Sequence, residues 1–438
     1  MAKLTFPGGI HTYDGKDLTK DKPTKVLLPK GELVYPLVQH IGAPARPVVA
    51  KGDKVLVGQI IAEAGGFVSS NIISAVSGTV KAIEKRLVVQ GTMVDSIVIE
   101  NDHEYNKVEG FGQKRDYNRL SKEEIRAIIK DAGIVGMGGA GFPTHVKLTP
   151  KDDSKIDYVI VNGAECEPYL TSDYRMMLEQ PETIIGGLKI ILRLFERAKG
   201  IIAIEDNKPD AIKILCELVA GEENISVLAL KTKYPQGGER QLVYATTGRK
   251  LNSKKLPADV GCIVNNIDTV IAIYMAVAKS TPLIRRIITV TGDAIKNPQN
   301  FNVPVGTDYS ELIEAAGGFV EMPEKIISGG PMMGNAIYTY NVPVTKISSA
   351  FTAFLKDKAA VVEQPCIRCG RCIMRCPLRL MPFELAALSN RSDSEGFVKY
   401  DGLECCGCGC CSYVCPAKRG LTQSIMQMRA NVLASRKK

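Results

Sequence analysis

The segments CIRCGRCIMRCP (residues 366–377) and CCGCGCCSYVCP (residues 405–416) decide the fold of the C-terminal part of this 438-residue chain. Both contain the spacing Cys-x2-Cys-x2-Cys-x3-Cys-Pro. This spacing is typical of chains that bind two iron–sulfur clusters, because the fourth cysteine of each run ligates the cluster of the other run. It predicts a ferredoxin-type domain with two [4Fe-4S] clusters over residues 355–438.

The expected cluster ligands form two crossed sets. They are Cys366, Cys369, Cys372 and Cys415 for the first cluster, and Cys405, Cys408, Cys411 and Cys376 for the second. Structural zinc is the alternative, but zinc uses paired Cys-x2-Cys units and leaves the third cysteine of each run without a purpose. We expect Cys406 and Cys410 to be non-ligating thiols, and Cys166, Cys216 and Cys262 to be small buried hydrophobic residues.

The distribution of cysteines also limits where the chain works. Ten of the 13 cysteines lie between Cys366 and Cys415, whereas a secreted disulfide scaffold spreads its cysteines through a small domain that follows a signal peptide. The first nine residues lack the apolar stretch of such a signal, so we expect a reducing compartment. The best candidate for a membrane span, residues 270–278, is too short to cross a bilayer. Any membrane association is therefore expected to be peripheral.

Charge and composition exclude further classes. Hydrophobic residues make up 45% and charged residues 24%, as in globular proteins. The net charge is +9, and from Cys366 onward 12 Lys and Arg face 5 Asp and Glu. A basic tail can bind nucleic acid, but these arginines alternate with cysteines and no nucleic-acid motif is present. We expect no nucleic-acid partner, because anionic clusters themselves call for nearby cations.

The N-terminal part, residues 1–110, is expected to be a β domain. Residues 51–84 contain short β-branched runs separated by Gly-Asp and Ser-Gly turns. The stretch resembles the barrel-sandwich hybrid of lipoyl and biotinyl domains. Its hairpin tip has Ser69, Ser70 and Asn71 in place of the lysine that those domains modify, so we expect the fold without the swinging-arm chemistry.

The middle of the chain is expected to contain an α/β domain followed by a smaller α+β module. Ser121 and Glu124 form a capping box at the start of a helix. Apolar strands at 158–161, 200–204, 225–230 and 261–264 then alternate with helical patterns such as 184–197, which favours a mostly parallel sheet. We assign residues 115–285 to this domain and residues 286–345 to the module, so the chain as a whole is multidomain, α/β and α+β.

Four motifs are expected to meet at one edge of the parallel sheet. They are GIVGMGGAGFPTHVK (133–147), VNGAECEP (161–168), YPQGGERQL (234–242) and VNNIDT (264–269). The last three begin where strands end, and ligands of open α/β sheets bind at the carboxyl ends of strands. The glycines would let the backbone approach a planar or phosphate-bearing ligand. The alternating Glu165 and Glu167 are expected to point to one face of an extended segment.

These motifs resemble the flavin-binding subunit of respiratory complex I. Residues 286–345 resemble its β-grasp, soluble-ligand-binding module. With FPGGIH (6–11), GGPMMG (329–334) and the two-cluster tail, the chain is most similar to the C subunit of Rnf-type ion-translocating ferredoxin:NAD oxidoreductases. We expect Met332 and Met333 of GGPMMG to serve packing.

The resemblance implies the residues of a Rossmann-like flavin and NADH site. Around FMN it places Gly136, Gly138, Gly139, Gly141, Lys147, Asn162, Asn265, Asn266 and Thr269. Where NADH stacks on the flavin it places Phe142, Glu165, Glu167 and Glu239, together with Gly238. The chain has Ala164 and Gly238 where the complex I subunit usually has acidic residues.

The function implied is electron transfer between NAD(H) and iron–sulfur clusters through FMN. A flavin is needed there because nicotinamide moves a hydride and each cluster takes one electron. The resemblance further implies a peripheral position on the cytoplasmic side of the cell membrane, with other subunits of the complex and ferredoxin as partners. Two alternatives remain, namely a flavin and iron–sulfur cobalamin reductase of bacterial microcompartments and a non-catalytic electron-relay subunit.

Overall fold

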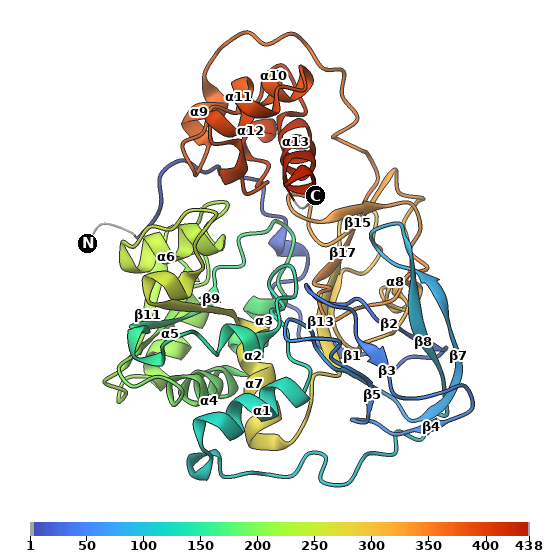
Figure 1. Ribbon diagram of the computed structural model, residues 1–438. Helices are drawn as coiled ribbons and strands as arrows, with labels where there is room; N and C mark the ends of the chain where they lie inside the picture. Colours follow the sequence, from blue (N-terminus) through green and yellow to red (C-terminus); the bar gives the residue numbers. More distant parts are fainter. Residues whose placement is uncertain (1–3, 437–438) are drawn as a thin grey trace.

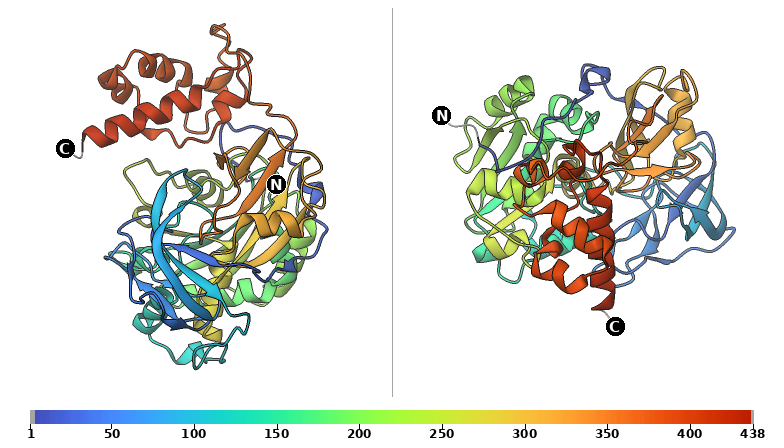
Figure 2. Two further views of the ribbon diagram at one scale, coloured as in Figure 1. Left: turned by 90° about the vertical axis from the view of Figure 1, so that its right-hand side faces the viewer. Right: turned by 90° about the horizontal axis from the view of Figure 1, so that it is seen from above.

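The computed structural model describes residues 4–436 and divides them into a β barrel, an α/β layer, a mixed sheet and a helical C-terminal unit (Figure 1). In this range no helix combines the length and the apolar character needed to cross a membrane. The mixed, multidomain fold class is therefore confirmed. Figure 2 shows the C-terminal unit seated over the junction of the other three parts.

The α/β layer has a four-stranded parallel sheet in the order β11-β10-β9-β12. The strands are β9 (Tyr158–Gly163), β10 (Lys199–Glu205), β11 (Ile225–Leu230) and β12 (Cys262–Asn266). The helices are α1 (Lys122–Asp131), α2 (Thr144–Lys147), α3 (Ser172–Glu179), α4 (Pro181–Leu192), α5 (Pro209–Leu218), α6 (Glu239–Thr247) and α7 (Ile267–Lys279). All four predicted strands and the capping box of Ser121 and Glu124 are confirmed.

One glycine determines how closely α4 and α7 pack. A Cβ atom on Gly187 of α4 would lie 2.2 Å from the backbone oxygen of Val270 in α7. Only a residue without a side chain allows this approach. The contact fixes α7, whose first turn carries Thr269, against the sheet that holds the predicted site.

The N-terminal barrel consists of two small antiparallel sheets around a core that includes Leu33, Tyr35 and Ile97. Its strands are β2 (Leu33–Pro36), β3 (Arg46–Pro47), β4 (Lys54–Val55), β5 (Ile60–Glu63), β6 (Ile72–Ile73), β7 (Gly78–Leu87) and β8 (Met93–Asn101). The predicted short strands are therefore confirmed. The hairpin tip is buried, since the Lys346 ammonium donates hydrogen bonds to Ser70 Oγ at 3.3 Å and to the Asn71 carbonyl.

The mixed sheet extends past the predicted limits of 286–345 on both sides. Its order is β1-β14-β13-β17-β15-β16. The strands are β1 (Lys25–Val26), β13 (Arg285–Thr291), β14 (Gln299–Pro304), β15 (Lys325–Ser328), β16 (Asn335–Ile337) and β17 (Ala350–Phe354), with helix α8 (Tyr309–Ala315) beside them. Because β17 pairs with both β13 and β15, and Phe351 is buried with Tyr309, this strand belongs to the sheet and not to the cysteine-rich tail.

The C-terminal unit is a group of short helices around Leu385, Phe397 and Ile425. They are α9 (Arg371–Arg375), α10 (Pro382–Asn390), α11 (Ser394–Lys399), α12 (Cys410–Tyr413) and α13 (Leu421–Ser435). Five of the ten cysteines of this unit lie before α9 or α12, whereas Cys372, Cys376 and Cys411 are buried in its core.

Candidate functional site

The carboxyl ends of β9 and β12 carry the first part of the site. Asn162, near the end of β9, donates a hydrogen bond from Nδ2 to the Gly237 carbonyl at 2.9 Å. The backbone amide of Gly237 donates in turn to the sulfur of Cys166 at 3.2 Å. These two contacts hold the loop of residues 234–239 over the end of the sheet, as the convergence of the motifs predicts.

The glycine loop lies against the first turn of α7. The backbone amide of Met137 donates to Thr269 Oγ1 at 3.0 Å. A Cβ atom on Gly138 would lie 2.9 Å from Cβ of Asn266, whereas one on Gly139 would meet nothing within 4 Å. The glycine loop therefore packs closely against α7 at Gly138 and has free space beside Gly139.

The remaining loop residues lie close by. The Gly136 amide donates to the Phe142 carbonyl at 2.9 Å, which closes the loop. Gly141 adopts a φ of 73° and its carbonyl accepts from the amide of Ile41 in the N-terminal barrel at 3.3 Å. Gly141 is therefore a contact between parts of the chain as well as a member of the loop.

Lys147 places a cation at the end of β12. Its Nζ donates to the Val264 carbonyl at 2.8 Å. Burial lowers the pKa of Lys147, and the carboxylate of Glu239 acts in the opposite direction. Glu239 is exposed and is the first residue of α6, directly after Gly238, the N-cap residue. A half-buried lysine facing a single exposed carboxylate is suited to bind an anionic group.

Two buried amide side chains at this edge have polar atoms without partners among residues 4–436. Both side-chain atoms of Asn265, and both of Gln236, are buried and make no hydrogen bond there. An unpartnered buried amide is costly, and in a native protein it calls for an explanation such as a bound ligand. Asn265 was predicted. Gln236 was missed, although it lies inside the YPQGGE motif, because no residue type was expected at that position.

The prediction that Glu165 and Glu167 point to one face is wrong. Glu165 has a φ of 47°, so the segment is not extended there. Its carboxylate accepts from the Asp173 amide at the start of α3 at 2.6 Å. The Glu167 carboxylate accepts from the amides of Met332 and Met333 at 2.7 and 3.1 Å. Both acids are used to fasten segments of the chain, which argues against the predicted contact with NADH.

A buried network of charged and polar side chains lies at the first turn of α7, against which the glycine loop packs. Asn266 caps α7 through the Asp268 amide and donates to Asp173 Oδ2 at 2.6 Å. Burial, with help from the nearby Glu165 and Asp268 carboxylates, raises the pKa of Asp173 to about 8. Asp268 forms a buried ion pair with Arg286. The network fixes the N-terminus of α7, where a phosphate is electrostatically favoured.

The C-terminal unit contains two cavities, each lined by cysteines from both runs. The first cavity is lined by Cys366, Cys369, Cys372 and Cys415, and the second by Cys376, Cys405, Cys408 and Cys411 together with Cys406 and Cys410. These groupings are the ones that the spacing predicts, while ligation itself stays a prediction. Within residues 4–436 no three such side chains converge as ligands of a single metal ion.

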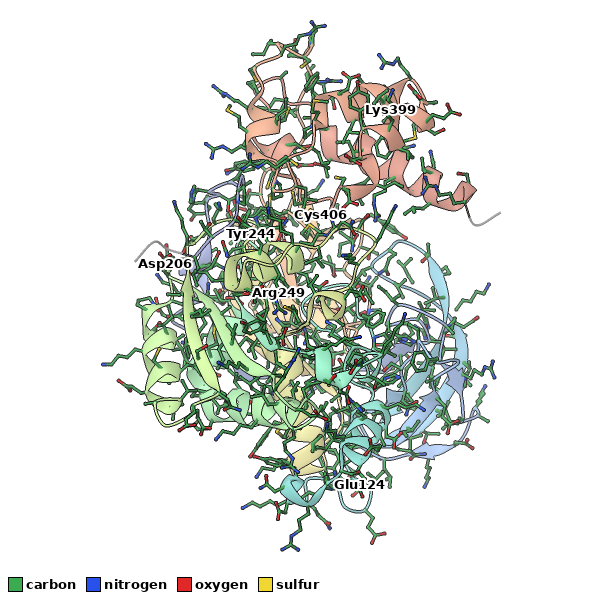
Figure 3. All side chains as sticks on the ribbon, turned by 60° about the vertical axis from the view of Figure 1, so that its left-hand side comes forward. Glu124, Asp206, Tyr244, Arg249, Lys399 and Cys406 are labelled. Carbon is green, nitrogen blue, oxygen red and sulfur yellow. The ribbon has the colours of Figure 1, made fainter. Side chains whose placement is uncertain are left out.

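The two cavities differ in their surroundings. Cys366 and Cys369 of the first are exposed, whereas Cys410 of the second is buried and contacts Tyr234 and Ile10. The second cavity also lies beside the ion pair of Arg240 in α6 with Glu404, at 2.9 Å. Figure 3 labels Cys406 on the side of the C-terminal unit toward the α/β layer and Lys399 on the far side.

The other predicted roles of cysteines and methionines are mixed. Cys262 is buried, but Cys216 on α5 is exposed, so the prediction of a buried Cys216 is wrong. Burial raises the pKa of the Cys405 thiol to about 12, which means that a bound metal would have to displace its proton. Met332 packs against the cluster of Ile10, Tyr234 and Cys410, which confirms it as a packing residue, whereas Met333 is 57% exposed, so that part of the prediction is wrong.

Comparison with known proteins places the chain in a family. Residues 4–104 match the model of the RnfC barrel sandwich hybrid domain, residues 129–275 that of the Nuo51 FMN-binding domain, and residues 287–336 that of the SLBB domain. The chain is 44% identical over 428 residues to the C subunit of the proton-translocating ferredoxin:NAD(+) oxidoreductase complex of Clostridium ljungdahlii, with 97% of this chain and 93% of the relative covered. The chain belongs to the RnfC family of ion-translocating ferredoxin:NAD+ oxidoreductases.

Other members of the RnfC family are similarly close. The C subunit of the Na(+)-translocating ferredoxin:NAD(+) oxidoreductase complex of Acetobacterium woodii is 41% identical over 438 residues, with 99% of this chain and 98% of the relative covered. Among solved structures, an NAD+-reducing [NiFe]-hydrogenase in the H2-reduced state has a TM-score of 0.50 at 17% identity, covering 73% of this chain and 62% of that chain. The hydrogenase likeness concerns the fold alone. The expected resemblance to the C subunit of Rnf-type complexes is confirmed.

Proposed function

We propose that this chain exchanges electrons between NAD(H) and two [4Fe-4S] clusters through FMN, as a peripheral subunit on the cytoplasmic side of a membrane-bound ferredoxin:NAD+ oxidoreductase complex. Its division is a barrel (1–110), a flavin and nucleotide domain (115–285), a β-grasp module (286–345, to which β1 and β17 add strands) and a two-cluster domain (355–438). The names of the relatives favour this reaction over cobalamin reduction.

FMN fits the edge of the parallel sheet. The unpartnered amides of Asn265 and Gln236 offer both donors and acceptors. Lys147 and the N-terminus of α7 offer positive charge to a phosphate. The other residues proposed around the cofactor are Gly136, Gly138, Gly139, Gly141, Asn162, Asn266 and Thr269. A bound flavin would accept a hydride from NADH and release electrons singly to iron–sulfur clusters.

The nucleotide is proposed to approach from the open side of the glycine loop. Phe142 offers an aromatic ring, and Gly238 and Glu239 begin α6 beside Lys147. Glu165 and Glu167 act indirectly, because their carboxylates hold α3 and the loop of residues 329–334 in place. The hydride step itself needs no general base, since it moves two electrons and the hydrogen together, whereas passing the two electrons on to clusters would release one proton to solvent.

The cysteine cavities fit iron–sulfur clusters. Each cavity presents the four thiols of one crossed set, and the second cavity adds Cys406 and Cys410 and an otherwise mostly apolar lining. We propose Cys366, Cys369, Cys372 and Cys415 as ligands of one cluster, and Cys376, Cys405, Cys408 and Cys411 as ligands of the other. Cys406 and Cys410 would remain thiols.

One observation carries the proposal. The loop of residues 234–239 takes part in both sites, because Gly237 is bound to Asn162 at the sheet edge while Tyr234 contacts Cys410 of the second cavity. The residues 6–11 reinforce this link, since Ile10 pairs with Tyr234 and the Gly9 amide donates to the Arg375 carbonyl at 3.0 Å. A flavin at the sheet edge and a cluster in the second cavity would therefore be neighbours.

The test is anaerobic reconstitution of the full chain with FMN, iron and sulfide. The account predicts one flavin that NADH bleaches and about eight iron atoms per chain, four for each cubane. Asn265→Ala should weaken FMN binding by roughly tenfold, which corresponds to about 1.4 kcal/mol, while Asn252→Ala, on an exposed loop of the same domain, serves as the control. Iron–sulfur clusters without any bound flavin would reject the enzymatic role and leave the electron relay.

A further inference from the structure

Lys346 is a buried charged side chain that the proposed electron path does not use. It lies just before β17 and is only 1% exposed. Burial is the one cause that lowers the pKa of Lys346, to about 7, with no contribution from a carboxylate. Burying an ammonium without such a partner is costly, so a native protein keeps it only where its contacts offset the cost. The contacts of Lys346 therefore indicate its purpose.

The ammonium of Lys346 joins the tip of the N-terminal barrel to the first residue of the glycine loop. Besides Ser70 Oγ and the Asn71 carbonyl at the tip, it donates to the Gly133 carbonyl at 2.8 Å. An ammonium has three N–H donors, and these three acceptors use all of them. The contact is tight, since a Cβ atom on Gly133 would lie 2.6 Å from the Asn71 carbonyl oxygen.

The next residue, Ile347, lies at the other end of the glycine-rich stretch. A Cβ atom on Gly141 would lie 2.5 Å from Cγ2 of Ile347 and 3.2 Å from the Gln39 carbonyl oxygen. The backbone amide of Lys346 donates to Oε1 of Gln39 at 3.0 Å, so the barrel also meets the turn before β17 there. Two consecutive residues thus contact both ends of the stretch.

Hydrogen bonds within the glycine loop fix its shape but not its position. Residues 134–136 pair with residues 142–144 through backbone hydrogen bonds of 2.9 and 3.0 Å, so the loop closes on itself. Its position depends on other segments, through the hydrogen bond of Met137 to Thr269 and the contacts of Lys346. A change at Lys346 therefore shifts the loop as a whole and leaves its own side chains intact.

We propose that Lys346 is a positioning residue for the flavin site, whose ammonium holds the glycine loop against the barrel tip in the conformation that binds FMN. The inference rests on the proposed function and gives the N-terminal barrel a part in it. Lys346 acts through the loop, because backbone and hydroxyl oxygens use its three donors.

The protonation of Lys346 makes this role measurable. A neutral amine has only two N–H donors, so deprotonation leaves one of the three acceptors without a partner. Because the pKa of Lys346 is about 7, the population of the ammonium falls between pH 6 and pH 8.5. Lower pH favours the ammonium, so the part of FMN binding that depends on it should weaken as the pH rises through this range.

The charged groups around Lys346 are few. On the barrel, burial and the charge of Lys346 lower the pKa of His40 to about 4. On β13, Arg286 is held in a buried ion pair, and residues 130–131 at the end of α1 are exposed. The Asp173 carboxyl, with a pKa of about 8, titrates in the same range but is common to every variant. Only the difference between variants is therefore assigned to Lys346.

The test measures FMN affinity by flavin fluorescence quenching on the full chain, reconstituted with iron and sulfide, at several values between pH 6 and pH 8.5. Lys346→Met keeps the length of the side chain and removes the charge with its three donors. The control Lys325→Met makes the same substitution on β15, where Lys325 is paired with Asp357 at 3.1 Å. Hydrogen exchange of residues 133–144 in the flavin-free chain gives a readout that needs no cofactor.

We expect Lys346→Met to bind FMN about tenfold more weakly than wild type at pH 6, and residues 133–144 to exchange faster. The difference in affinity should shrink toward pH 8.5, where the wild-type lysine has lost its proton. Ser70→Ala, which removes one of the three acceptors, should weaken binding by about threefold at pH 6, and this difference should shrink in the same way. Lys325→Met should match wild type throughout.

Three results would overturn the positioning role while leaving the proposed function standing. One is wild-type FMN affinity in Lys346→Met at pH 6. Another is a loss of affinity in Lys346→Met that is equal at pH 6 and pH 8.5, which would assign the effect to packing. If Lys346→Met does not fold, Ser70→Ala decides, and wild-type affinity in that variant is the third. Absence of FMN binding in wild type would instead reject the proposed function, and the hydrogen exchange of residues 133–144 would then be compared on its own.

Discussion

The two cysteine cavities come from the same sequence motif and yet face different surroundings. The first opens to solvent between exposed arginines, and the second is buried against the loop of residues 234–239. Figure 1 shows the C-terminal unit above both α6 of the α/β layer and β15 of the mixed sheet. Spacing alone makes the two runs equivalent, so it is their packing that distinguishes the exposed first cavity from the second cavity beside the α/β layer.

The largest expected effect concerns the crossing of the two runs. Cys376→Ser should remove the cluster of the second cavity, and Cys415→Ser that of the first, although each residue follows the other three cysteines of the opposite set in sequence. Each variant should lose about half of its iron, because a cubane needs four ligands. Iron analysis with electron paramagnetic resonance distinguishes the two variants. Loss of the first-cavity signal in Cys376→Ser, or of the second-cavity signal in Cys415→Ser, would contradict the crossed ligation.

The next largest effect concerns the contact between residues 6–11 and the second cavity, measured as the free energy of unfolding. A Cβ atom on Gly8 would lie 2.6 Å from the Cys376 carbonyl, and Gly8 has a φ of 73°. Gly8→Ala should lower the free energy of unfolding by about 2–4 kcal/mol, combining backbone strain with overpacking. Gly52→Ala is the control, since its φ is 94° but a Cβ atom there would meet nothing within 4 Å. We expect a cost of only about 1 kcal/mol for this variant in the same chemical denaturation experiment.

Equal costs for the two glycine variants would mean that residues 6–11 do not hold the C-terminal unit in place. Limited proteolysis in the connecting segment 355–365 gives a second measurement. Faster cleavage in Gly8→Ala than in Gly52→Ala supports the attachment, because a detached unit exposes its connection.

Substitution of Glu404 is expected to lower the free energy of unfolding by a smaller amount. It accepts hydrogen bonds from the Ser253 amide and hydroxyl at 2.8 and 2.6 Å and pairs with Arg240. Burial alone would raise the pKa of Glu404, but the contacts with Ser253 and Arg240 outweigh it and lower the pKa. Glu404→Gln should therefore cost about 1 kcal/mol at neutral pH.

The pH dependence of Glu404 follows from the direction of its shift. A carboxyl whose pKa is lowered by folding stabilises the protein above the usual value of 4.5, and this contribution is lost as the pH falls through the folded pKa. The difference between wild type and Glu404→Gln in thermal unfolding should thus shrink below pH 4.5. A difference that stays constant down to pH 3 would contradict the role given to the ion pair.

The smallest effect is expected for the two additional thiols. Cys406→Ala and Cys410→Ala should keep the full iron content, since neither belongs to a crossed set of four. Cys410→Ala should cost about 1 kcal/mol, because the thiol is buried against Tyr234, and Cys406→Ala less. Loss of half of the iron in either variant would mean that it replaces Cys405, Cys408 or Cys411 as a ligand.

Features that depend on residues close together in the sequence could be predicted, whereas features that depend on contacts between distant segments could not. The strands of the α/β layer and the grouping of the cysteines could be read from patterns within one segment. The strand β17 could not, because its partners β13 and β15 come from elsewhere in the chain. Glu165 was misplaced because a left-handed backbone conformation at a non-glycine residue leaves no signal in the sequence. Gln236 was missed because the feature that distinguishes it, a buried amide without hydrogen-bond partners, is visible only in the structure.

The most direct test of the central claim is stopped-flow mixing of reduced ferredoxin with the FMN-loaded Cys408→Ser variant in the absence of NAD+. The proposed function makes the second cavity the connection between the first cavity and the flavin site at the sheet edge. In Cys408→Ser, reduction should therefore stop at the first cavity and leave the flavin absorbance unchanged over the time in which the wild-type flavin is bleached. Bleaching of the flavin in Cys408→Ser at the wild-type rate would contradict the account.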